Sequence, residues 1–432
     1  MPFASLGLSP VVCSPLSRLG YQTPTPVQLK SIPIVLTGKD LLARAQTGTG
    51  KTAAFGLPMI DRLLVRGGAA AGMRKPRGLV LVPTRELALQ VHKSLSTYGV
   101  PANLRVTAIF GGVSIVPQKK ELVRGTDIIV ATPGRLLDHI EQRTVDLTGI
   151  QILTLDEADR MLDMGFLPPL RRILKMLPRD RQTLLFSATI SAEVVKLSAD
   201  FTRDPQRVDV SEGQVMASTV THRVHPVTDH RKGDLLTHVL RESPGAQALV
   251  FCKTKHGSNR VGQYLERAGI GAGVIHGNKS QGARTRALAD FKAGRVTVLV
   301  ATDIAARGLD IPQLPLVVNF DLPLVPEDYI HRAGRTGRAG LAGRAVSLVS
   351  PADRDLLRGI QRLLAEPIEH ITVEGFATTA GSQDALPDPG RRHHGRPNRG
   401  FGGHNNRNGH RPHRPSGPGR RPSSQRRSFV RG

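Results

Sequence analysis

The chain has 432 residues, a length that predicts at least two domains. Its formal net charge is +25, and residues 380–432 alone hold twelve arginines against two aspartates, so we expect a polyanionic partner. Two cysteines far apart exclude a disulfide framework or a cysteine-rich zinc module and favour a reducing compartment. Neither a signal peptide nor an apolar run of ~20 residues is evident, which predicts a soluble, cytoplasmic protein.

The N-terminal segment, residues 3–26, spaces its leucines as a helix does and is interrupted at Gly20 and Tyr21. Thr25 followed by Pro26 is typical of a helix start, since threonine caps the first turn and proline fits its first position. We therefore expect a helix from Pro26 onward. Gln28 lies in its first turn, where a glutamine on its own predicts no more than a solvent-exposed position.

A glycine-rich motif from Ala45 to Thr52 lies between a short apolar run and residues that favour a helix. A turn of this kind between a strand and a helix directs backbone N–H groups at a phosphate. Lys51 can reach the β- and γ-phosphates, and Thr52 can offer its hydroxyl to Mg²⁺. Alanine stands at position 45, where the generic motif has glycine. The predicted phosphate-binding residues are Ala45, Gln46, Thr47, Gly48, Thr49, Gly50, Lys51 and Thr52.

Four apolar runs follow, at residues 78–82, 127–131, 150–155 and 182–186, and each is succeeded by polar residues. Nearly continuous apolar runs separated by helical patterns predict a parallel β-sheet covered by helices on both faces. Parallel strands end at the same edge of a sheet, where ligands bind in open α/β folds. We therefore expect the polar segments 83–86, 132–135, 156–159 and 187–189 to converge at that edge.

A stretch with few large apolar residues, 209–221, is predicted to be a linker after an N-terminal domain of residues 1–208. Five further apolar runs, at residues 246–251, 272–276, 296–301, 316–320 and 345–349, predict a second α/β domain over residues 222–377. That domain has no phosphate motif of its own. Residues 378–432, rich in Gly, Pro, Arg, His and Asn, are predicted to be disordered because they cannot bury enough apolar surface.

Asp156 and Glu157 close one buried run. In a nucleoside triphosphatase, Asp156 can hold Mg²⁺ and Glu157 can orient or deprotonate the attacking water, whereas the competing interpretation is a carboxylate pair at a helix start. Residues 331–338 hold three arginines spaced by three, which a helix would place on one face. This pattern favours arginines directed at a nucleotide held by the first domain, although a nucleic-acid-binding patch would also account for it.

With these motifs in this order, the sequence resembles the DEAD-box ATP-dependent RNA helicases of superfamily 2. The resemblance covers residues 3 to about 350 and is carried by Asp156-Glu157-Ala158-Asp159, Ser187-Ala188-Thr189 and residues 331–338. The opening Phe3-x-x-Leu-x-Leu and residues 160–166 are most similar to the bacterial RhlE-type branch. The resemblance implies two tandem RecA-like parallel-sheet domains, here followed by a disordered basic tail.

The resemblance also implies roles for individual residues at a bound nucleotide. Tyr21 would stack on the adenine and Gln28 would read its edge, with Phe3 supporting both. The cofactors would be ATP and Mg²⁺, and the metal-binding residues would be Thr52 and Asp156. The catalytic residues implied are Lys51, Asp156, Glu157, Ser187, Thr189, His331, Arg335 and Arg338, with Gly308 and Asp310 near the nucleotide.

RNA is the partner that the resemblance implies, as a single strand or a short duplex. The RNA-contacting residues would be Thr84, Arg85, Gly112, Thr132, Arg135, Lys253, Gln281, Arg284 and Thr302. Contacts of this kind to the RNA backbone give salt-dependent binding with little sequence preference. ATP and RNA together would close the two domains, and the closed state would unwind short duplexes or remodel RNA–protein complexes.

Two alternatives remain open from the sequence. One is a DNA helicase, and the other is a non-enzymatic RNA-binding or annealing protein whose active part is the basic tail. We expect the tail to bind RNA, while docking to ribosomal particles or to the RNA-degradation machinery is the competing interpretation.

Overall fold

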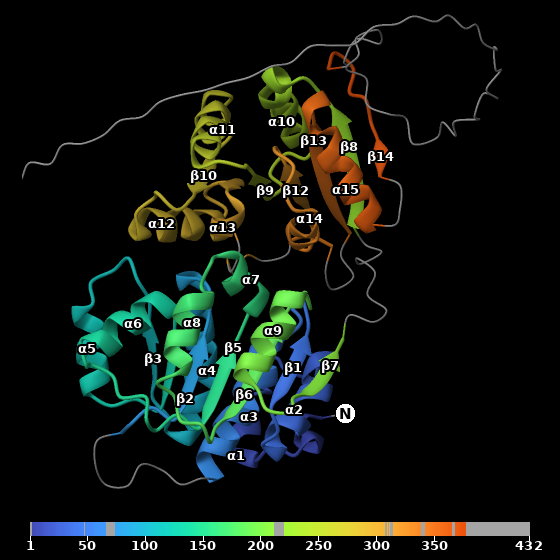
Figure 1. Cartoon of the computed structure of the whole chain (residues 1–432). Helices are drawn as coiled ribbons and strands as arrows, with labels where there is room; N and C mark the ends of the chain where they lie inside the picture. The colour runs from blue at the N-terminus through green and yellow to red at the C-terminus, as the bar shows by residue number, and fades with distance from the viewer. Residues whose placement is uncertain are drawn as a thin grey trace, which may run out of the picture. The chain divides into compact units, whose positions relative to one another are not determined.

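Two parallel β-sheets of seven strands each organise the residues that the computed structural model describes (Figure 1). These residues are 2–46, 48–65, 74–210, 220–306, 309, 311, 314–337, 342–364 and 368–376. We call residues 2–210 the first lobe and residues 220–376 the second lobe. The predicted α/β class with two parallel sheets is confirmed. No helix in the described ranges is long and apolar enough to cross a membrane.

The sheet of the first lobe has the strand order β3-β4-β2-β5-β6-β1-β7, and every neighbouring pair is parallel. Its strands are β1 (Leu41–Arg44), β2 (Gly78–Leu81), β3 (Val106–Ile109), β4 (Ile128–Ala131), β5 (Ile152–Leu155), β6 (Gln182–Ser187) and β7 (Gln206–Asp209). Because all seven run in one direction, the residues that follow them emerge at a single edge.

Helices cover both faces of this sheet (Figure 1). Those of the first lobe are α1 (Pro10–Cys13), α2 (Pro26–Thr37), α3 (Lys51–Val65), α4 (Arg85–Gly99), α5 (Val116–Val123), α6 (Pro133–Glu141), α7 (Ala158–Asp163), α8 (Leu167–Leu174) and α9 (Ala192–Phe201), with short 3₁₀ turns at Phe3–Leu6 and Val100–Ala102. Successive strand residues alternate between the faces. Leu184 and Phe186 of β6 pack with α2, α3 and α4, whereas Leu185 packs with α6 to α9.

The sheet of the second lobe has the order β10-β11-β9-β12-β13-β8-β14, again parallel throughout. Its strands are β8 (Val220–Pro226), β9 (Ala248–Phe251), β10 (Ala272–Ile275), β11 (Val298–Ala301), β12 (Leu316–Asn319), β13 (Gly343–Val349) and β14 (Glu369–His370). Its helices are α10 (Lys232–Arg241), α11 (Lys255–Arg267), α12 (Gln281–Lys292), α13 (Asp303–Ala306), α14 (Pro326–Ala333) and α15 (Arg354–Leu364), with 3₁₀ turns at Asp229–Arg231 and Pro351–Asp353.

The predicted linker lies between β7, which ends at Asp209, and β8, which begins at Val220. Both strands therefore take residues from the ends of the predicted range 209–221. Residues 211–219 and the predicted tail from residue 378 onward are outside the described ranges. The exact domain limits stay a prediction.

Candidate functional site

The phosphate loop leaves β1 and is fastened to the neighbouring strand, because the Ala45 N–H donates to the Ser187 carbonyl oxygen over 2.9 Å. Gly48 and Gly50 have φ values of 79° and 91°, which only glycine adopts without strain. The Thr49 hydroxyl donates to the Gln46 carbonyl oxygen over 2.7 Å and tightens the turn. Helix α3 then begins at Lys51, so the loop opens onto a helix N-terminus as predicted. Thr47 lies outside the described residues.

Lys51 is buried with its ammonium group facing the acidic segment after β5. Its Nζ lies 3.8 Å from Asp156 Oδ1 and has no hydrogen-bond partner in the part of the chain described here. A buried ammonium without hydrogen bonds is costly unless an anion satisfies it. The geometry therefore fits a nucleotide phosphate between the loop and Asp156.

Asp156 is almost fully buried at the carboxyl end of β5. Burial raises the pKa of Asp156 to about 6, and the nearby Lys51 charge offsets only part of that effect. A carboxylate whose charge is costly in this position gains from a bound cation. Among the described residues, no three His, Cys, Asp or Glu side chains gather to hold a metal alone. A divalent ion here would need phosphate and water oxygens besides Asp156 and Thr52, which is the usual mode for Mg²⁺.

Glu157 has φ 56° and ψ 54°, a left-handed conformation at the N-cap of α7. Such a conformation is unfavourable for a residue with a side chain and is maintained by its surroundings, often at functional sites. Here Arg160 Nη1 lies 2.9 Å from Glu157 Oε2, and both side chains are buried. Glu157 is the N-cap residue of α7, but its side chain makes no capping hydrogen bond there. Sequence reasoning missed Arg160 as a partner of Glu157.

Asp159 joins this acidic segment to the segment after β6. Its N–H donates to Ser187 Oγ over 3.3 Å, and its Oδ2 accepts from the Thr189 N–H over 2.9 Å and from the Thr189 hydroxyl over 3.1 Å. Burial acts to raise the pKa of Asp159, but the Lys51 charge and backbone N–H groups outweigh it and hold the pKa below its usual value. One side chain thus ties the acidic segment after β5 to Ser187 and Thr189 after β6.

Gln28 is 1 % exposed, so the expectation of a surface position is wrong. Helix α2 begins at Pro26 as predicted, and Gln28 Oε1 accepts from the Thr25 N–H over 2.9 Å. Its Nε2 donates to the Gly50 carbonyl oxygen over 3.1 Å, which ties the helix to the phosphate loop. The signal in the sequence was the pattern Thr-Pro-x-Gln, in which the glutamine folds back onto the cap.

Three aromatic rings lie together beside this segment. Tyr21 meets Phe3 edge to face with centroids 5.9 Å apart, and meets Tyr98 of α4 in the same way at 6.2 Å. The Tyr21 and Tyr98 hydroxyl oxygens are 2.6 Å apart. Phe3 and Tyr98 are buried, and Tyr21 is half-buried. Sequence reasoning missed Tyr98.

The predicted RNA-contacting residues of the first lobe converge after β2, β3 and β4. The Arg85 guanidinium lies against Gly112, whose φ is 76°, so closely that any side chain at Gly112 would overlap it. Arg135 Nη2 donates to the Val113 carbonyl oxygen over 3.0 Å. Thr84 and Thr132 are the N-caps of α4 and α6. Two helix N-termini and two guanidinium groups make a surface suited to phosphates.

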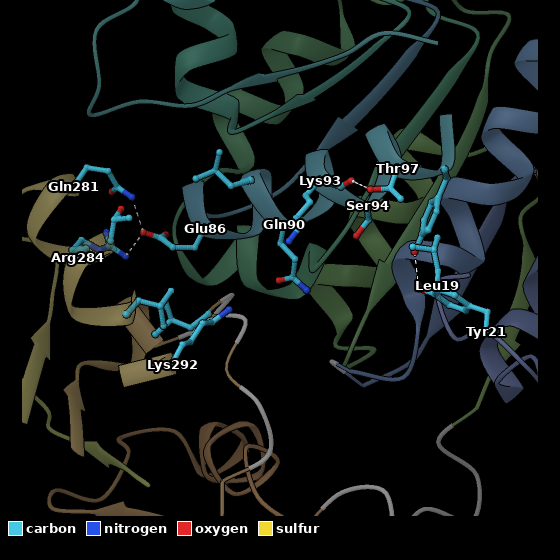
Figure 2. A pocket seen from close by; sticks show the side chains of 15 residues that line it. Leu19, Tyr21, Glu86, Gln90, Lys93, Ser94, Thr97, Gln281, Arg284 and Lys292 are labelled. Carbon is cyan, nitrogen blue, oxygen red and sulfur yellow. Dashed lines mark hydrogen bonds and ion pairs between the residues drawn. The ribbon is translucent and has the colours of Figure 1, made fainter. Parts of the chain in front are cut away.

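In the second lobe, the predicted RNA-contacting residues follow β9, β10 and β11. As in the first lobe, they lie at the carboxyl ends of parallel strands. The Lys253 N–H donates to Asp321 Oδ2 over 2.8 Å, Gln281 opens α12, and Thr302 precedes α13. Figure 2 shows Gln281 and Arg284 directed at Glu86, whose Oε1 lies 3.3 Å from Gln281 Nε2 and 2.8 Å from Arg284 Nη2.

The helical interpretation of residues 331–338 is wrong, because α14 ends at Ala333 and the chain turns at Gly334. Arg332 is 2 % exposed and bonded inside the second lobe, so it does not point at a nucleotide. Arg335 lies beyond the helix, and its Nη1 donates to the Leu309 carbonyl oxygen over 3.1 Å. His331 Nδ1 is 3.7 Å from Asp328 Oδ1. In the second lobe, the predicted residues outside the described ranges are Gly308, Asp310 and Arg338.

Comparisons with known proteins identify both halves of the chain. The sequence profile of the DEAD/DEAH box helicases matches residues 25–197, and that of the helicase conserved C-terminal domain matches residues 231–340. The chain is 42% identical over 377 residues to the ATP-dependent rRNA helicase rrp3 of Neosartorya fischeri, which covers 86% of this chain and 78% of that protein. It is 41% identical over 389 residues to the DEAD-box ATP-dependent RNA helicase 52A of Oryza sativa subsp. japonica. This match covers 84% of this chain and 64% of that protein.

Among solved structures, S. cerevisiae Dbp5 bound to RNA and ADP BeF3 matches with a TM-score of 0.77 at 30% identity, over 86% of this chain and 95% of that one. This likeness confirms the two tandem RecA-like domains. The relatives named here are fungal and plant proteins, so they lend no support to the bacterial branch. The chain belongs to the DEAD-box family of ATP-dependent RNA helicases, and its activity is RNA-dependent hydrolysis of ATP.

Proposed function

We propose that the carboxyl ends of β1, β5 and β6 form the ATP site of the first lobe. Gln28 and Tyr21 hold the adenine, with Phe3 supporting the Tyr21 ring. The loop N–H groups and the Lys51 ammonium hold the phosphates. The observation that carries this proposal is the buried cluster of Lys51, Asp156, Glu157 and Asp159, in which the lysine lacks a hydrogen-bond partner among the described residues.

Asp156, through water, and Thr52 are the residues that would hold Mg²⁺. When bound, the ion neutralises negative charge on the phosphate oxygens. Glu157, held by Arg160, orients a water molecule and accepts its proton as the oxygen attacks the γ-phosphorus and the bond to ADP breaks. Arg335 and Arg338 of the second lobe stabilise the charge that develops on the transferred phosphoryl group, and His331 belongs to the same segment.

RNA is held by residues that follow the neighbouring strands β2, β3 and β4 in the first lobe and β9, β10 and β11 in the second lobe. Thr84, Arg85, Gly112, Thr132 and Arg135 face its backbone from the first lobe, where the clustering of Arg85, Gly112 and Arg135 supports the assignment. Lys253, Gln281, Arg284 and Thr302 act from the second lobe. ATP and RNA bind together and favour the closed clamp, which bends one strand and separates a short duplex. Hydrolysis, sensed at Ser187 and Thr189 through Asp159, reopens it.

Several finer assignments belong to this proposal. The domains are residues 1–208 and 222–377 with a linker at 209–221, and the protein acts in the cytoplasm. Ribosomal RNA or ribosomal particles are the proposed targets, because relatives are named rRNA helicases. RNA-degradation machinery is the alternative partner of the tail. The bacterial RhlE-type assignment rests on Phe3-x-x-Leu-x-Leu and residues 160–166 alone.

The replacement Glu157→Gln tests the ATP site. It preserves shape but cannot accept a proton, so RNA-stimulated ATP hydrolysis should fall at least 100-fold, in keeping with the general-base contribution of about 10²–10⁴. ATP-dependent RNA binding should persist, because the phosphates and RNA are held by other residues. The measurements are steady-state ATPase assays and fluorescence anisotropy of labelled RNA with and without ATP.

Glu193→Gln is the matched control, since Glu193 is an exposed glutamate on α9 of the same lobe. Its turnover should equal that of the wild type. Continued unwinding turnover by the Glu157 variant would contradict the proposed role. Equal stimulation of the wild-type ATPase by DNA and RNA would contradict the proposed preference for RNA.

A further inference from the structure

Gln118 of α5 lies beneath the predicted RNA-contacting residues of the first lobe. Its side chain is 7 % exposed, and its amide lies between three groups from other segments. The Nε2 donates to the Phe110 carbonyl oxygen over 2.9 Å, while the Oε1 lies 3.1 Å from His139 Nε2 and 3.4 Å from Arg135 Nη1. Sequence reasoning assigned no role to Gln118 or His139.

These contacts determine the orientation of the amide and the tautomer of the histidine. A carbonyl oxygen can only accept, so the nitrogen of the amide must face Phe110 and its oxygen must face Arg135 and His139. His139 therefore carries its proton on Nε2. Its Nδ1 is left as an acceptor 2.7 Å from the Thr144 hydroxyl oxygen, whose single proton also lies within reach of the His139 carbonyl oxygen at 3.0 Å. Burial lowers the pKa of His139 to about 4, so the ring keeps this neutral form at physiological pH.

The amide restrains two parts of the predicted RNA surface at once. Phe110 directly precedes Gly111 and Gly112, so the bond to its carbonyl fixes the start of that loop. Arg135 fixes the end of the loop through the Val113 carbonyl oxygen. Because Gln118 accepts from the same guanidinium, one buried side chain holds both the loop and the arginine that clasps it.

We propose that Gln118, supported by His139, is a positioning residue for RNA binding: it holds Gly112 and Arg135 in the arrangement that receives the RNA backbone. The proposal rests on the proposed RNA contacts of Gly112 and Arg135. Preorganisation of this kind removes the cost of ordering a loop and a long side chain at the moment of binding. Its loss should appear as weaker RNA binding without a change in chemistry.

The replacement Gln118→Leu has a similar size but neither donates nor accepts. It should weaken RNA binding about tenfold, the effect of losing one or two ordered groups. In RNA titrations of the ATPase rate, the apparent KM for RNA should rise while kcat at saturating RNA stays near the wild-type value. Binding of a fluorescent ADP analogue without RNA should not change. Gln142→Leu, an exposed glutamine directly after α6, is the matched control and should leave the KM for RNA unchanged.

Gln118→Glu gives a second, milder variant in case the leucine variant folds poorly. It retains the acceptor for Arg135 and His139 but places a carboxylate oxygen, which cannot donate, against the Phe110 carbonyl oxygen, so its KM for RNA should also rise above that of the wild type. In Arg135→Ala, adding Gln118→Leu should cost less than it costs alone, since the guanidinium is already gone.

The outcomes separate the two proposals. If Arg135→Ala leaves RNA affinity unchanged, the proposed RNA surface is wrong. If Arg135→Ala weakens RNA binding but both Gln118 variants retain the wild-type KM for RNA, the positioning role is overturned. A change confined to kcat would overturn it as well.

Discussion

At the scale of single residues, a side-chain contact joins the first turn of α2, which is proposed to hold the adenine, to the phosphate loop of residues 45–52. Gln28 Nε2 donates to the Gly50 carbonyl oxygen, and Gly50 has φ 91°. A Cβ at Gly50 would overlap the Gln28 amide nitrogen. The glycine therefore serves both the turn and the approach of the glutamine.

Replacing Gly50 with Ala tests this contact. The added methyl group would push Gln28 away in addition to straining the backbone, so the KM for ATP should rise at least tenfold, equivalent to about 1.4 kcal/mol of binding free energy. Gly20→Ala is the control, because Gly20 also has positive φ but a methyl group added there would have no neighbouring atom within 4 Å. If both variants raise the KM for ATP equally in nucleotide titrations, backbone strain explains the effect and the contact does not.

The buried His139 should make the folding stability depend on pH. Burial lowers its pKa to about 4, with the Arg135 and Lys119 charges acting in the same direction and Asp138 opposing them. An unfolded histidine titrates near 6.5, so between about pH 6.5 and pH 4 the unfolded chain binds a proton that the folded chain excludes. The contribution of His139 to stability is fully present above pH 6.5 and decreases as the pH falls through this window.

The slope from this one group is at most about 1.4 kcal/mol per pH unit. Imidazole NMR signals of His139 should keep their neutral positions down to about pH 4. Denaturant unfolding at pH 7 and pH 5 should show a smaller loss of stability in His139→Gln than in the wild type. A His139 signal that titrates near pH 6.5 would contradict the burial argument.

At the scale of elements, Arg332 connects the strand ends of the second lobe. Its guanidinium pairs with both carboxylate oxygens of Asp303 at 2.6 Å and 2.7 Å and donates to Asn319 Oδ1 over 2.9 Å. It also lies 4.9 Å from the Phe251 ring centroid. One side chain of α14 thus holds the last residues of β9 and β12 and the first residue of α13.

Arg332→Lys should therefore destabilise the second lobe. An ammonium cannot reproduce the bidentate pair, and breaking a buried ion pair costs about 3–5 kcal/mol. Chemical denaturation should show the loss, and ATPase activity should fall with it, because Arg335 follows directly in the turn. Arg358→Lys, in an exposed pair with Asp355 on α15, should change the free energy of unfolding by less than about 0.5 kcal/mol. A wild-type unfolding midpoint for Arg332→Lys would contradict this structural role.

The strands show which parts of the fold could be predicted from the sequence. The strands buried on both faces, such as β5 and β6, are continuous apolar runs and were predicted within two residues of their ends. Strands β7, β8 and β14 lie at or next to sheet edges. They contain Gln, Arg, His or Glu, so no continuous apolar run in the sequence indicates these strands. The arginines at 331–338 were misinterpreted because spacing alone does not show that the helix ends at Ala333.

The sequence predicted motif residues better than it predicted the side chains that contact them. The motif residues Lys51, Asp156 and Glu157 were predicted from local pattern and lie together as expected. Gln118 and Tyr98 were missed, because each acts through a contact in three dimensions with a residue of another segment. Arg160 was also missed, although it follows its partner Glu157 by only three residues. Such supporting residues carry no short motif.

At the scale of the whole molecule, strand order divides each sheet edge into two parts. In the first lobe, β1, β5 and β6 are neighbours and carry the segments proposed to face the nucleotide, whereas β2, β3 and β4 are neighbours and carry the predicted RNA-facing segments. The parts adjoin at β2 and β5. In the second lobe, β9, β10 and β11 likewise carry the predicted RNA-facing residues, and β12 leads to α14. Each lobe can thus contact both ligands with one rigid sheet.

The basic tail, residues 380–432, carries positive charge in addition to that of the two lobes. Residues 380–432 hold twelve arginines and two aspartates, a net charge of +10 out of the chain's +25. If these arginines bind RNA phosphates, each arginine–phosphate pair that a deletion removes should lower the slope of log affinity against log salt by about 0.7 for a single strand. Deleting residues 380–432 should therefore weaken RNA binding most at low salt and flatten the salt dependence. The RNA-saturated ATPase rate should remain, because every residue of the proposed ATP site precedes residue 377.

Replacing the twelve arginines with glutamine keeps the length of the tail and should reproduce the deletion, whereas lysine at the same positions should preserve the salt slope. RNA anisotropy titrations between about 50 and 200 mM salt would measure this slope, since that range changes the affinity of phosphate-binding proteins strongly. If the deletion leaves both affinity and slope unchanged, the tail does not bind RNA. The arginines would then serve a protein partner, and the glutamine variant should lose that partner while its RNA titration matches the wild type.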